Sequence, residues 1–247
     1  MSTTDANQDS STDTIDPFSG GSGVRNCKED ALSDREFELL LEATQTLDGY
    51  QATEAKWSIL ATGRLGMRVG ELIHMQRDWI DWSAKRIDIP RHEPCRKGRN
   101  GGICGYCRQH ADQQAETDGN DVDEERAIKI RWKPKTAAAA RSIPFDFDVR
   151  AEIAIEEYFD DRTQYSGSHS AVHRRISKVA DRVDELDSDD VYPHALRATA
   201  ASYHSARDIE AGTLQSLMGW KEITTATVYL QSSGERTQQS INAAHRR

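Results

Sequence analysis

The segment from Tyr192 to Leu230 constrains the fold of this chain more tightly than any other stretch. Pro193 is typical of the first turn of a helix, where its missing N–H is one of the donors that a helix leaves unpaired. Gly219 and Trp220 predict the end of a following helix, and Tyr229 comes nine residues after Trp220 on a further helical pattern. The segment therefore predicts a helical C-terminal part of the domain.

Four side chains of this segment are candidates for one site. His194 and Arg197 lie three residues apart at the start of the first predicted helix, so both can face the same way. Backbone N–H groups and the positive end of the helix dipole favour an anion there. Taken singly, these two residues suit a capping histidine and a surface arginine, while Trp220 and Tyr229 suit a core and a half-buried aromatic residue. Brought together, the four would hold a phosphate group and offer it a nucleophile.

Apolar periodicity elsewhere predicts a mainly α-helical domain with a small antiparallel β-sheet, the α+β class. Ser33 and Glu36 predict a capping box at the start of the first helix. Apolar and polar residues alternate over 80–89 around Ser83-Ala84, which predicts a β-hairpin. The predicted helices before the C-terminal segment cover 33–49, 53–63, 67–76, 149–159 and 170–183, and two further strands cover 127–132 and 141–144.

Composition divides the chain into three parts. Residues 1–30 consist largely of Ser, Thr, Asp and Gly, which predicts a disordered acidic tail. Residues 31–230 carry the apolar periodicity and form the predicted domain. Residues 231–247 are polar, and we expect a C-terminal tail or a weak helix there.

The chain carries a formal net charge of -9. The surplus of acidic residues suits a protein from a salt-rich cytoplasm, such as that of a halophilic archaeon, where surface charges are heavily screened. The net charge therefore argues little against a nucleic-acid partner, because clusters of basic residues remain. No apolar run is long enough to span a membrane and the N-terminus lacks the pattern of a signal peptide, so we expect a cytoplasmic protein.

Residues 91–126 interrupt the periodicity, and we expect an inserted irregular loop there that is rich in Cys and Gly and ends in an acidic run. Cys104 and Cys107 form a C-x-x-C turn, and Cys95 precedes them by nine residues. With His110 as fourth ligand, or His92 in its place, they predict a tetrahedral structural zinc site. A redox C-x-x-C pair and unliganded cysteines are the alternatives. The flanking basic residues would make this zinc knob able to contact phosphates: Arg91, Arg96, Lys97, Arg99 and Arg108.

Two sites upstream of the C-terminal segment add basic residues. Glu71 follows Arg68 by three residues, a spacing that lets the carboxylate orient the guanidinium on a helix. An ordinary surface ion pair is the alternative for such a motif. Lys135 lies in or beside the turn between two predicted strands, where it could reach into a groove. Lys133 competes for this role, and a solvated hairpin lysine is the alternative for both.

In this order and context, the motifs resemble those of the catalytic domain of the tyrosine recombinase (phage integrase) family. The most specific are T-G-x-x-x-x-R-x-x-E-L at 62–72, P-K-T with R-S-I-P at 134–144, H-A-L-R at 194–197, and L-M-G-W with T-x-Y at 217–229. The resemblance covers Leu32 to Leu230 apart from the Cys-bearing insertion. It implies a DNA breaking-rejoining catalytic domain over 31–230.

The resemblance implies a definite mechanism. Tyr229 would attack the scissile phosphate and form a 3′-phosphotyrosine bond, releasing a 5′-hydroxyl group. Arg68 and Arg197 would hold the non-bridging oxygens, and Glu71 would orient a guanidinium. No metal or nucleotide would be needed for catalysis. Three further catalytic residues are implied. His194 would act as acid/base or donate a hydrogen bond to the phosphate, and Trp220 would donate through its indole N–H. Lys135 would protonate the leaving 5′-oxygen.

Double-stranded DNA is the implied partner, with other protomers joining in a synaptic tetramer. The family usually carries a helical core-binding domain before the catalytic domain, whereas a tail precedes Leu32 here. The alternative function is therefore that of a non-catalytic DNA-binding relative, a regulator or accessory factor. The basic residues expected to contact DNA are Arg64, Lys133, Arg141, Arg174, Arg175 and Lys178.

Overall fold

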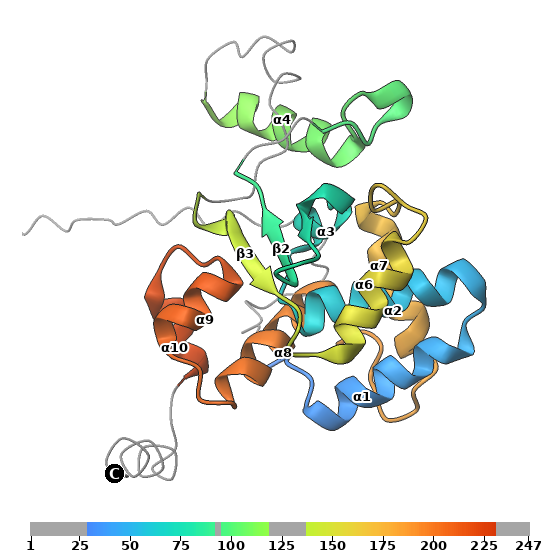
Figure 1. Cartoon of the computed structure of the whole chain (residues 1–247), viewed down its shortest axis with the longest axis vertical. Coiled ribbons are helices and arrows are strands. Elements are labelled where there is room, and N and C mark those ends of the chain that lie inside the picture. The colour runs from blue at the N-terminus through green and yellow to red at the C-terminus, as the bar shows by residue number, and fades with distance from the viewer. Residues whose placement is uncertain (1–28, 92–94, 119–136, 231–247) are drawn as a thin grey trace, which may run out of the picture.

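The computed structural model describes residues 29–91, 95–118 and 137–230, which form a mainly helical structure with a three-stranded antiparallel sheet (Figure 1). This confirms the predicted fold class. The helices are α1 (Asp34–Ala43), α2 (Gly49–Gly63), α3 (Val69–Ile73), α4 (Gly105–Asp118), α6 (Val149–Phe159), α7 (His169–Ala180), α8 (Pro193–Ser205), α9 (Ala211–Met218) and α10 (Ile223–Tyr229). The strands are β1 (Ile80–Asp81), β2 (Arg86–Ile89) and β3 (Arg141–Pro144).

Helix α2 is the central element of the larger hydrophobic core. Trp57 and Leu60 have no exposed surface, and almost every α2 residue from Glu54 onward is buried. The helix packs against α6, α7 and α8, so apolar side chains suit all of its faces (Figure 1). Helix α1 covers one side of this core and begins with the predicted Ser33–Glu36 capping box.

The sheet has the order β1-β2-β3 with antiparallel pairing throughout. Ile87 pairs with Ile80 on one side and with Ile143 on the other, and this row of isoleucines is buried. The opposite face carries polar pairs such as Asp88 and Ser142. The predicted hairpin and the predicted strand 141–144 are therefore confirmed. The predicted strand 127–132 lies outside the described residues, as do the tails 1–28 and 231–247.

Helices α8, α9 and α10 share a second, smaller hydrophobic cluster. Ala200 and Ala201 of α8 pack with Leu214 and Met218 of α9 and with Ala226 of α10. Figure 1 shows α9 and α10 together on the side of the sheet away from α1. The segment before α3 meets the end of α9, because the carbonyls of Gly66 and Met218 both accept hydrogen bonds from Arg197. Within the described ranges, no helix combines the length and apolarity required to cross a bilayer.

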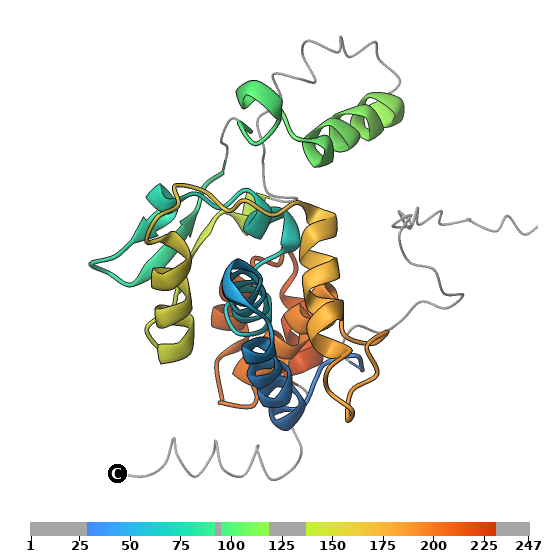
Figure 2. The ribbon, with the colours of Figure 1, turned by 90° about the vertical axis from the view of Figure 1, so that its right-hand side faces the viewer.

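The structure corrects several predicted boundaries. The first helix ends at Ala43 and α2 begins at Gly49, while α3 is shorter than the predicted helix 67–76. The larger correction concerns the insertion, where α4 replaces the expected irregular loop. The sequence of α4 is polar along most of its length, so apolar periodicity cannot reveal it, although Gln, Ala and Glu are good helix formers. Helix α4 lies outside the main helical body (Figure 2).

Two isoleucines of α6 test this assignment of the core. Ile155 has no exposed surface, whereas Ile153, two residues earlier on the same helix, is 43% exposed. We expect Ile155→Ala to lower the free energy of unfolding by about 2–5 kcal/mol, because it leaves a cavity. Ile153→Ala should change it by less than about 1 kcal/mol. Urea unfolding followed by circular dichroism measures both, and equal losses would contradict the described orientation of α6.

Candidate active site

Helix α3 begins with the expected contact between Arg68 and Glu71. Arg68 precedes the first residue of the helix, and its backbone N–H donates to Glu71 Oε2 at 2.8 Å. The guanidinium Nη1 donates to Glu71 Oε1 at 2.9 Å. The spacing of three residues therefore closes a small ring that fixes the side chain of Arg68 at the start of the helix.

Arg141 of β3 binds the same carboxylate, and its side chain is buried. Its Nη1 and Nη2 donate to the two oxygens of Glu71 at 2.8 and 3.1 Å. Carbonyl oxygens of Leu217, Ala139 and Gly66 accept its other N–H groups. All five donors of the guanidinium are thus used, and its side chain is 3% exposed. The prediction that Arg141 contacts DNA is therefore wrong in this structure.

Arg197 of α8 bridges the boundary between the two hydrophobic clusters. Its Nη1 donates to the carbonyl of Gly66, before α3, and its Nη2 donates to the carbonyl of Met218, at the end of α9. Gly66 has φ +64°, and a Cβ there would lie 2.6 Å from Met218 Sδ. Glycine adopts this backbone conformation without strain and leaves room for the side chain of Met218.

The C-terminal end of α9 organises the three arginines. Leu217, Met218 and Gly219 follow one another, and their carbonyls accept from Arg141, Arg197 and Arg68 respectively. Gly219 ends the helix in the left-handed region at φ +60°, a common helix terminus. A Cβ on Gly219 would lie 3.0 Å from Arg141 Nη1. The glycine therefore permits both the turn and the approach of the guanidinium.

The described site carries more positive than negative charge. Three guanidinium groups surround a single carboxylate, that of Glu71. Burial alone would raise the pKa of Glu71, but the charge and hydrogen bonds of Arg141, with Arg197 and Arg68, lower that pKa to about 2. Burial, together with repulsion by Arg68 and Arg141, lowers the pKa of Arg197 well below its ordinary value. An anion bound here would offset this repulsion.

Arg68 and Arg197 retain donors that an anion could use. Each guanidinium has five N–H donors, and each uses two of them on acceptors among the described residues. Three donors of each group thus have no acceptor within those ranges. The Arg68 side chain is 22% exposed, and Arg197 is 5% exposed. The two expected phosphate-holding arginines are brought together, with Arg68 on the more open side.

Tyr229 of α10 packs against Trp220, which follows the end of α9. Their rings stack with centroids 5.3 Å apart and an angle of 16° between planes. The Tyr229 phenol is among the groups that act on the pKa of Arg197, so it lies within electrostatic reach of that guanidinium. His194 is exposed in the first turn of α8, three residues before Arg197. Lys135 and its competitor Lys133 lie outside the described residues.

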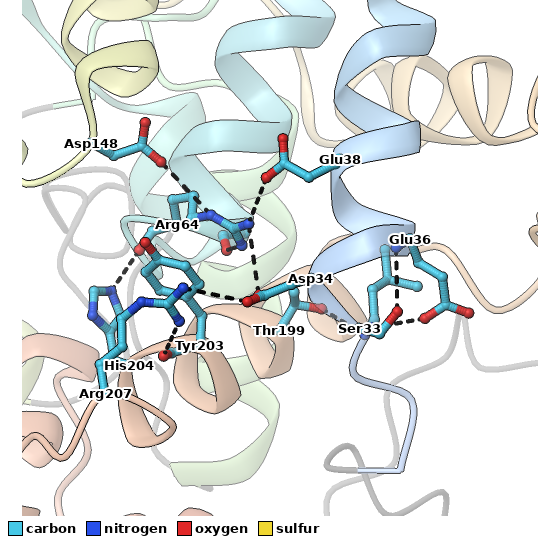
Figure 3. Close-up of polar contacts among 12 residues, drawn as sticks. Ser33, Asp34, Glu36, Glu38, Arg64, Asp148, Thr199, Tyr203, His204 and Arg207 are labelled. Atoms are coloured by element: carbon cyan, nitrogen blue, oxygen red, sulfur yellow. Dashed lines mark hydrogen bonds and ion pairs between the residues drawn. The ribbon is translucent and has the colours of Figure 1, made fainter.

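Arg64 is a structural residue and is not a DNA contact in this structure, contrary to prediction (Figure 3). It is 1% exposed and lies at the end of α2, with Glu38 at 3.3 Å and Asp148 at 3.7 Å. Its guanidinium is sandwiched between the rings of Phe37 and Tyr203, at 3.6 and 4.1 Å from their centroids. Arg64 thus joins α1, α2 and α8 through charge and stacking.

The predicted basic face of α7 is only partly available to a ligand. Arg174 and Lys178 are exposed, and Lys178 Nζ donates to Gln51 Oε1 at 2.8 Å. Arg175 Nε donates to the buried carboxylate of Glu54 at 2.8 Å, so its charge is already paired. Arg174 and Lys178 remain candidates for contact with DNA, whereas Arg175 has a structural partner.

A second group of side chains is suited to hold a metal ion. His74, Cys95, Cys104 and Cys107 place their ligand atoms within 4.8 Å of one another. The three cysteines are those that the sequence predicts, but the histidine is not. His110, the expected fourth ligand, is outside this group, and its ring packs edge-on against Tyr106 at 4.5 Å. The alternative ligand His92 lies outside the described residues.

His74 escapes prediction from spacing, because it precedes Cys95 by 21 residues and comes from the domain body. His110 follows Cys107 by three residues and fits the usual ligand spacing. The pairing of Arg141 with Glu71 is similarly absent from local sequence. The only available signal for His74 was the need of three cysteines for a fourth ligand.

Comparisons with known proteins support the fold. No family model matches the sequence, and neither does any curated protein. Among solved structures, the chain is similar to the Tn1549 transposon integrase in complex with circular intermediate DNA, with 16% identity, a TM-score of 0.59 and coverage of 87% of this chain and 66% of that one. It is also similar to the XerA recombinase, with 16% identity, a TM-score of 0.51 and coverage of 88% and 64%.

The catalytic domain of bacteriophage HP1 integrase is a further similar structure, with 13% identity, a TM-score of 0.50 and coverage of 86% of this chain and 93% of that one. The chain therefore has the fold of a tyrosine recombinase catalytic domain, which confirms the predicted resemblance at the level of fold. It spans about two thirds of the length of the Tn1549 integrase and XerA chains.

The buried carboxylate of Glu71 predicts a specific dependence of stability on pH. Its pKa of about 2 lies below the ordinary value of 4.5, so the unfolded chain binds more protons between these values. The stabilisation is complete above about pH 4.5 and is lost as the pH falls toward 2. Glu71→Gln should remove this part of the pH dependence, as measured by urea unfolding between pH 3 and pH 7.

The exposed Glu42 offers a matched control on α1. Glu42→Gln should retain the steep loss of stability of the unaltered chain below about pH 4.5. Parallel profiles for Glu71→Gln and the unaltered chain would contradict the assignment of Glu71 as the charged partner of the arginines.

Proposed function

We propose that this protein is a site-specific DNA recombinase that cleaves and rejoins strands through a 3′-phosphotyrosine intermediate. One observation carries the proposal: Arg68 and Arg197 converge with spare donors and surplus positive charge, within electrostatic reach of the Tyr229 phenol. A buried excess of guanidinium groups suits a phosphodiester, whose two non-bridging oxygens accept forked hydrogen bonds. A hydroxyl group beside such a site is better explained as a nucleophile than as a group that only binds DNA.

The cleavage step forms one bond and breaks one bond. The Tyr229 oxygen attacks the scissile phosphorus, a P–O bond to the tyrosine forms, and the P–O5′ bond breaks. The phenol proton leaves to a base, and the departing 5′-oxygen takes up a proton from an acid. His194 and Lys135 are the proposed proton carriers, and the Trp220 indole N–H is proposed to donate a hydrogen bond to the phosphate. Attack by a 5′-hydroxyl of a partner strand reverses the step and rejoins DNA.

Glu71 and Arg141 act as positioning residues in this proposal. Arg141 has no remaining donor for a phosphate, and Glu71 is 2% exposed at its side chain. Together they hold the guanidinium of Arg68 against the carbonyl of Gly219. The proposed chemistry therefore uses preorganised charges of the chain to stabilise the phosphorane, and it routes no step through a metal.

The comparisons support DNA as the partner. The similar Tn1549 integrase is in complex with circular intermediate DNA, and the XerH site-specific recombinase is bound to difH substrate. On that basis we propose that this chain binds double-stranded DNA and that several protomers assemble on it. The second candidate is a DNA-binding relative without cleavage, since the structural similarity concerns the fold alone.

Covalent capture distinguishes these two functions. The protein is incubated with sheared DNA from its source, and the fragments that it binds are isolated and sequenced to find the site. A nicked duplex of that site should then give a covalent adduct on a denaturing gel with the unaltered chain. Tyr229→Phe should give none, because it lacks the attacking oxygen. Tyr50→Phe is the control, because it removes the hydroxyl of a tyrosine that is 41% exposed and forms a hydrogen bond with Ser166.

Each outcome of this experiment is informative. If the unaltered chain and Tyr229→Phe bind DNA equally and neither forms an adduct, the protein is a DNA-binding relative and not a recombinase. If Tyr229→Phe forms as much adduct as the unaltered chain, the nucleophile is another residue.

The role of Arg68 can be tested by separating binding from chemistry. Arg68→Lys retains a charge but loses the planar fork, so adduct formation should slow by roughly 10²–10³-fold. DNA affinity at constant salt should fall by much less, because many other contacts with phosphates contribute to it. Arg35→Lys, at a side chain that is 80% exposed, should leave both unchanged. Equal losses of affinity and rate for Arg68→Lys would assign Arg68 to binding alone.

A further inference from the structure

The group formed by His74, Cys95, Cys104 and Cys107 has the composition and size of a closed metal site. Cys107 Sγ lies 3.1 Å and Cys104 Sγ 3.5 Å from His74 Nε2. Zinc–ligand bonds of about 2.3 Å to sulfur and 2.0–2.1 Å to nitrogen, at tetrahedral angles, place neighbouring ligand atoms about 3.5 Å apart. Three thiolates and one imidazole form a common structural zinc set. The cysteines of the described ranges are free of disulfides.

The surrounding backbone is arranged for such ligands. The N–H groups of Cys104 and Cys107 donate to the sulfurs of Cys95 and Cys104, at 3.4 and 3.5 Å. His74 Nδ1 lies 2.7 Å from the carbonyl of Gly70, which accepts a hydrogen bond only if Nδ1 is protonated. The Nε2 lone pair then faces the sulfurs, as in metal-bound histidines whose other nitrogen donates to a carbonyl.

His74 connects this group to the candidate active site through α3. Arg68 precedes the first residue of α3, Glu71 is its third residue, and His74 follows its last. A helix of five residues is too short to be stable without restraints from its surroundings. Glu71 restrains the N-terminal end of α3, and a metal on His74 would restrain the other end.

Two further contacts attach the insertion to the same helix. Lys97 Nζ donates to the carbonyl of Ile73 at 2.6 Å, to that of Tyr165 at 2.8 Å and to that of Gly167. A Cβ added to Gly70 would lie 3.0 Å from the hydroxyl of Tyr106, so the first turn of α4 lies close to α3. Lys97 therefore points into the domain, contrary to the prediction that it extends a basic knob toward phosphates.

From these contacts we infer that His74, Cys95, Cys104 and Cys107 bind one Zn²⁺ ion, which orders the start of α4 and holds α3 in place. The metal has a structural role, because four protein ligands leave no open position for a substrate. The consequence for Arg68 and Glu71 as phosphate-site residues rests on the proposed function. The metal site itself rests only on the four ligands and their surroundings.

Metal content tests the ligand set directly. The full chain, purified from zinc-supplemented cells, should contain about one equivalent of zinc by elemental analysis. Co²⁺ substituted for zinc should give the visible absorption bands of tetrahedral thiolate coordination. His74→Ala should weaken Co²⁺ binding by more than the roughly 10–100-fold that loss of an outer-shell partner causes. His110→Ala is the matched histidine control. Cys27→Ser, at the cysteine of the N-terminal segment 1–30, is the cysteine control, and both variants should bind Co²⁺ normally.

Several results would overturn this assignment. A metal-free folded chain, or a disulfide between Cys104 and Cys107 in the purified protein, would exclude the structural zinc site. Loss of Co²⁺ binding in His110→Ala with retention in His74→Ala would show that the fourth ligand is wrong.

Hydrogen exchange tests the connection between the metal and α3. Amides of 68–74 should exchange faster after removal of zinc with a chelator, while those of α6 should remain protected. Unchanged exchange in 68–74, or an equal loss of protection in α6, would overturn the local role. This readout needs no DNA, so a chain that binds zinc but forms no covalent adduct would refute the proposed function and leave the metal site intact.

Discussion

The last carbonyls of α9 impose the constraint on which the candidate site depends. A helix leaves its final carbonyl groups without partners, and those that are buried need donors from elsewhere. Here Leu217, Met218 and Gly219 are each satisfied by an arginine from a different part of the chain. The donors come from β3, from α8 and from the residue before α3. One helix end thus brings together segments that are far apart in sequence.

This arrangement explains why four charged groups are stable at a boundary between two cores. Glu71 neutralises part of the charge, the helix end supplies partial negative charge, and glycines at 66 and 219 let the backbone approach. Among the described residues, Glu71 is the one carboxylate that forms an ion pair with these arginines. Such a site is preorganised at some expense in stability, which an anionic ligand would restore. The contacts that join the two cores here are therefore the same contacts that leave this site with more positive than negative charge.

Local features of this fold were predictable, whereas long-range partners were not. The Ser33–Glu36 capping box and the Arg68–Glu71 contact follow from a spacing of three residues, and the hairpin follows from alternation. Arg64 and Arg68 stand four residues apart in one motif, yet one is buried among carboxylates and the other faces the site. Their difference depends on α1 and α6, which no local pattern specifies. The same holds for His74, whose cysteine partners lie beyond the hairpin.

The segment between Ile89 and Arg141, which contains the insertion, leaves and re-enters the sheet at a single place, because Ile89 of β2 is the register partner of Arg141 of β3. Its two ends are therefore neighbours, and the strand order would be unaltered if a tight turn replaced everything between them. A segment of this kind can be acquired or exchanged in evolution without redesign of the surrounding domain. Because Lys135 lies between Ile89 and Arg141 in the sequence, such an exchange would also replace one of the residues proposed for the chemistry.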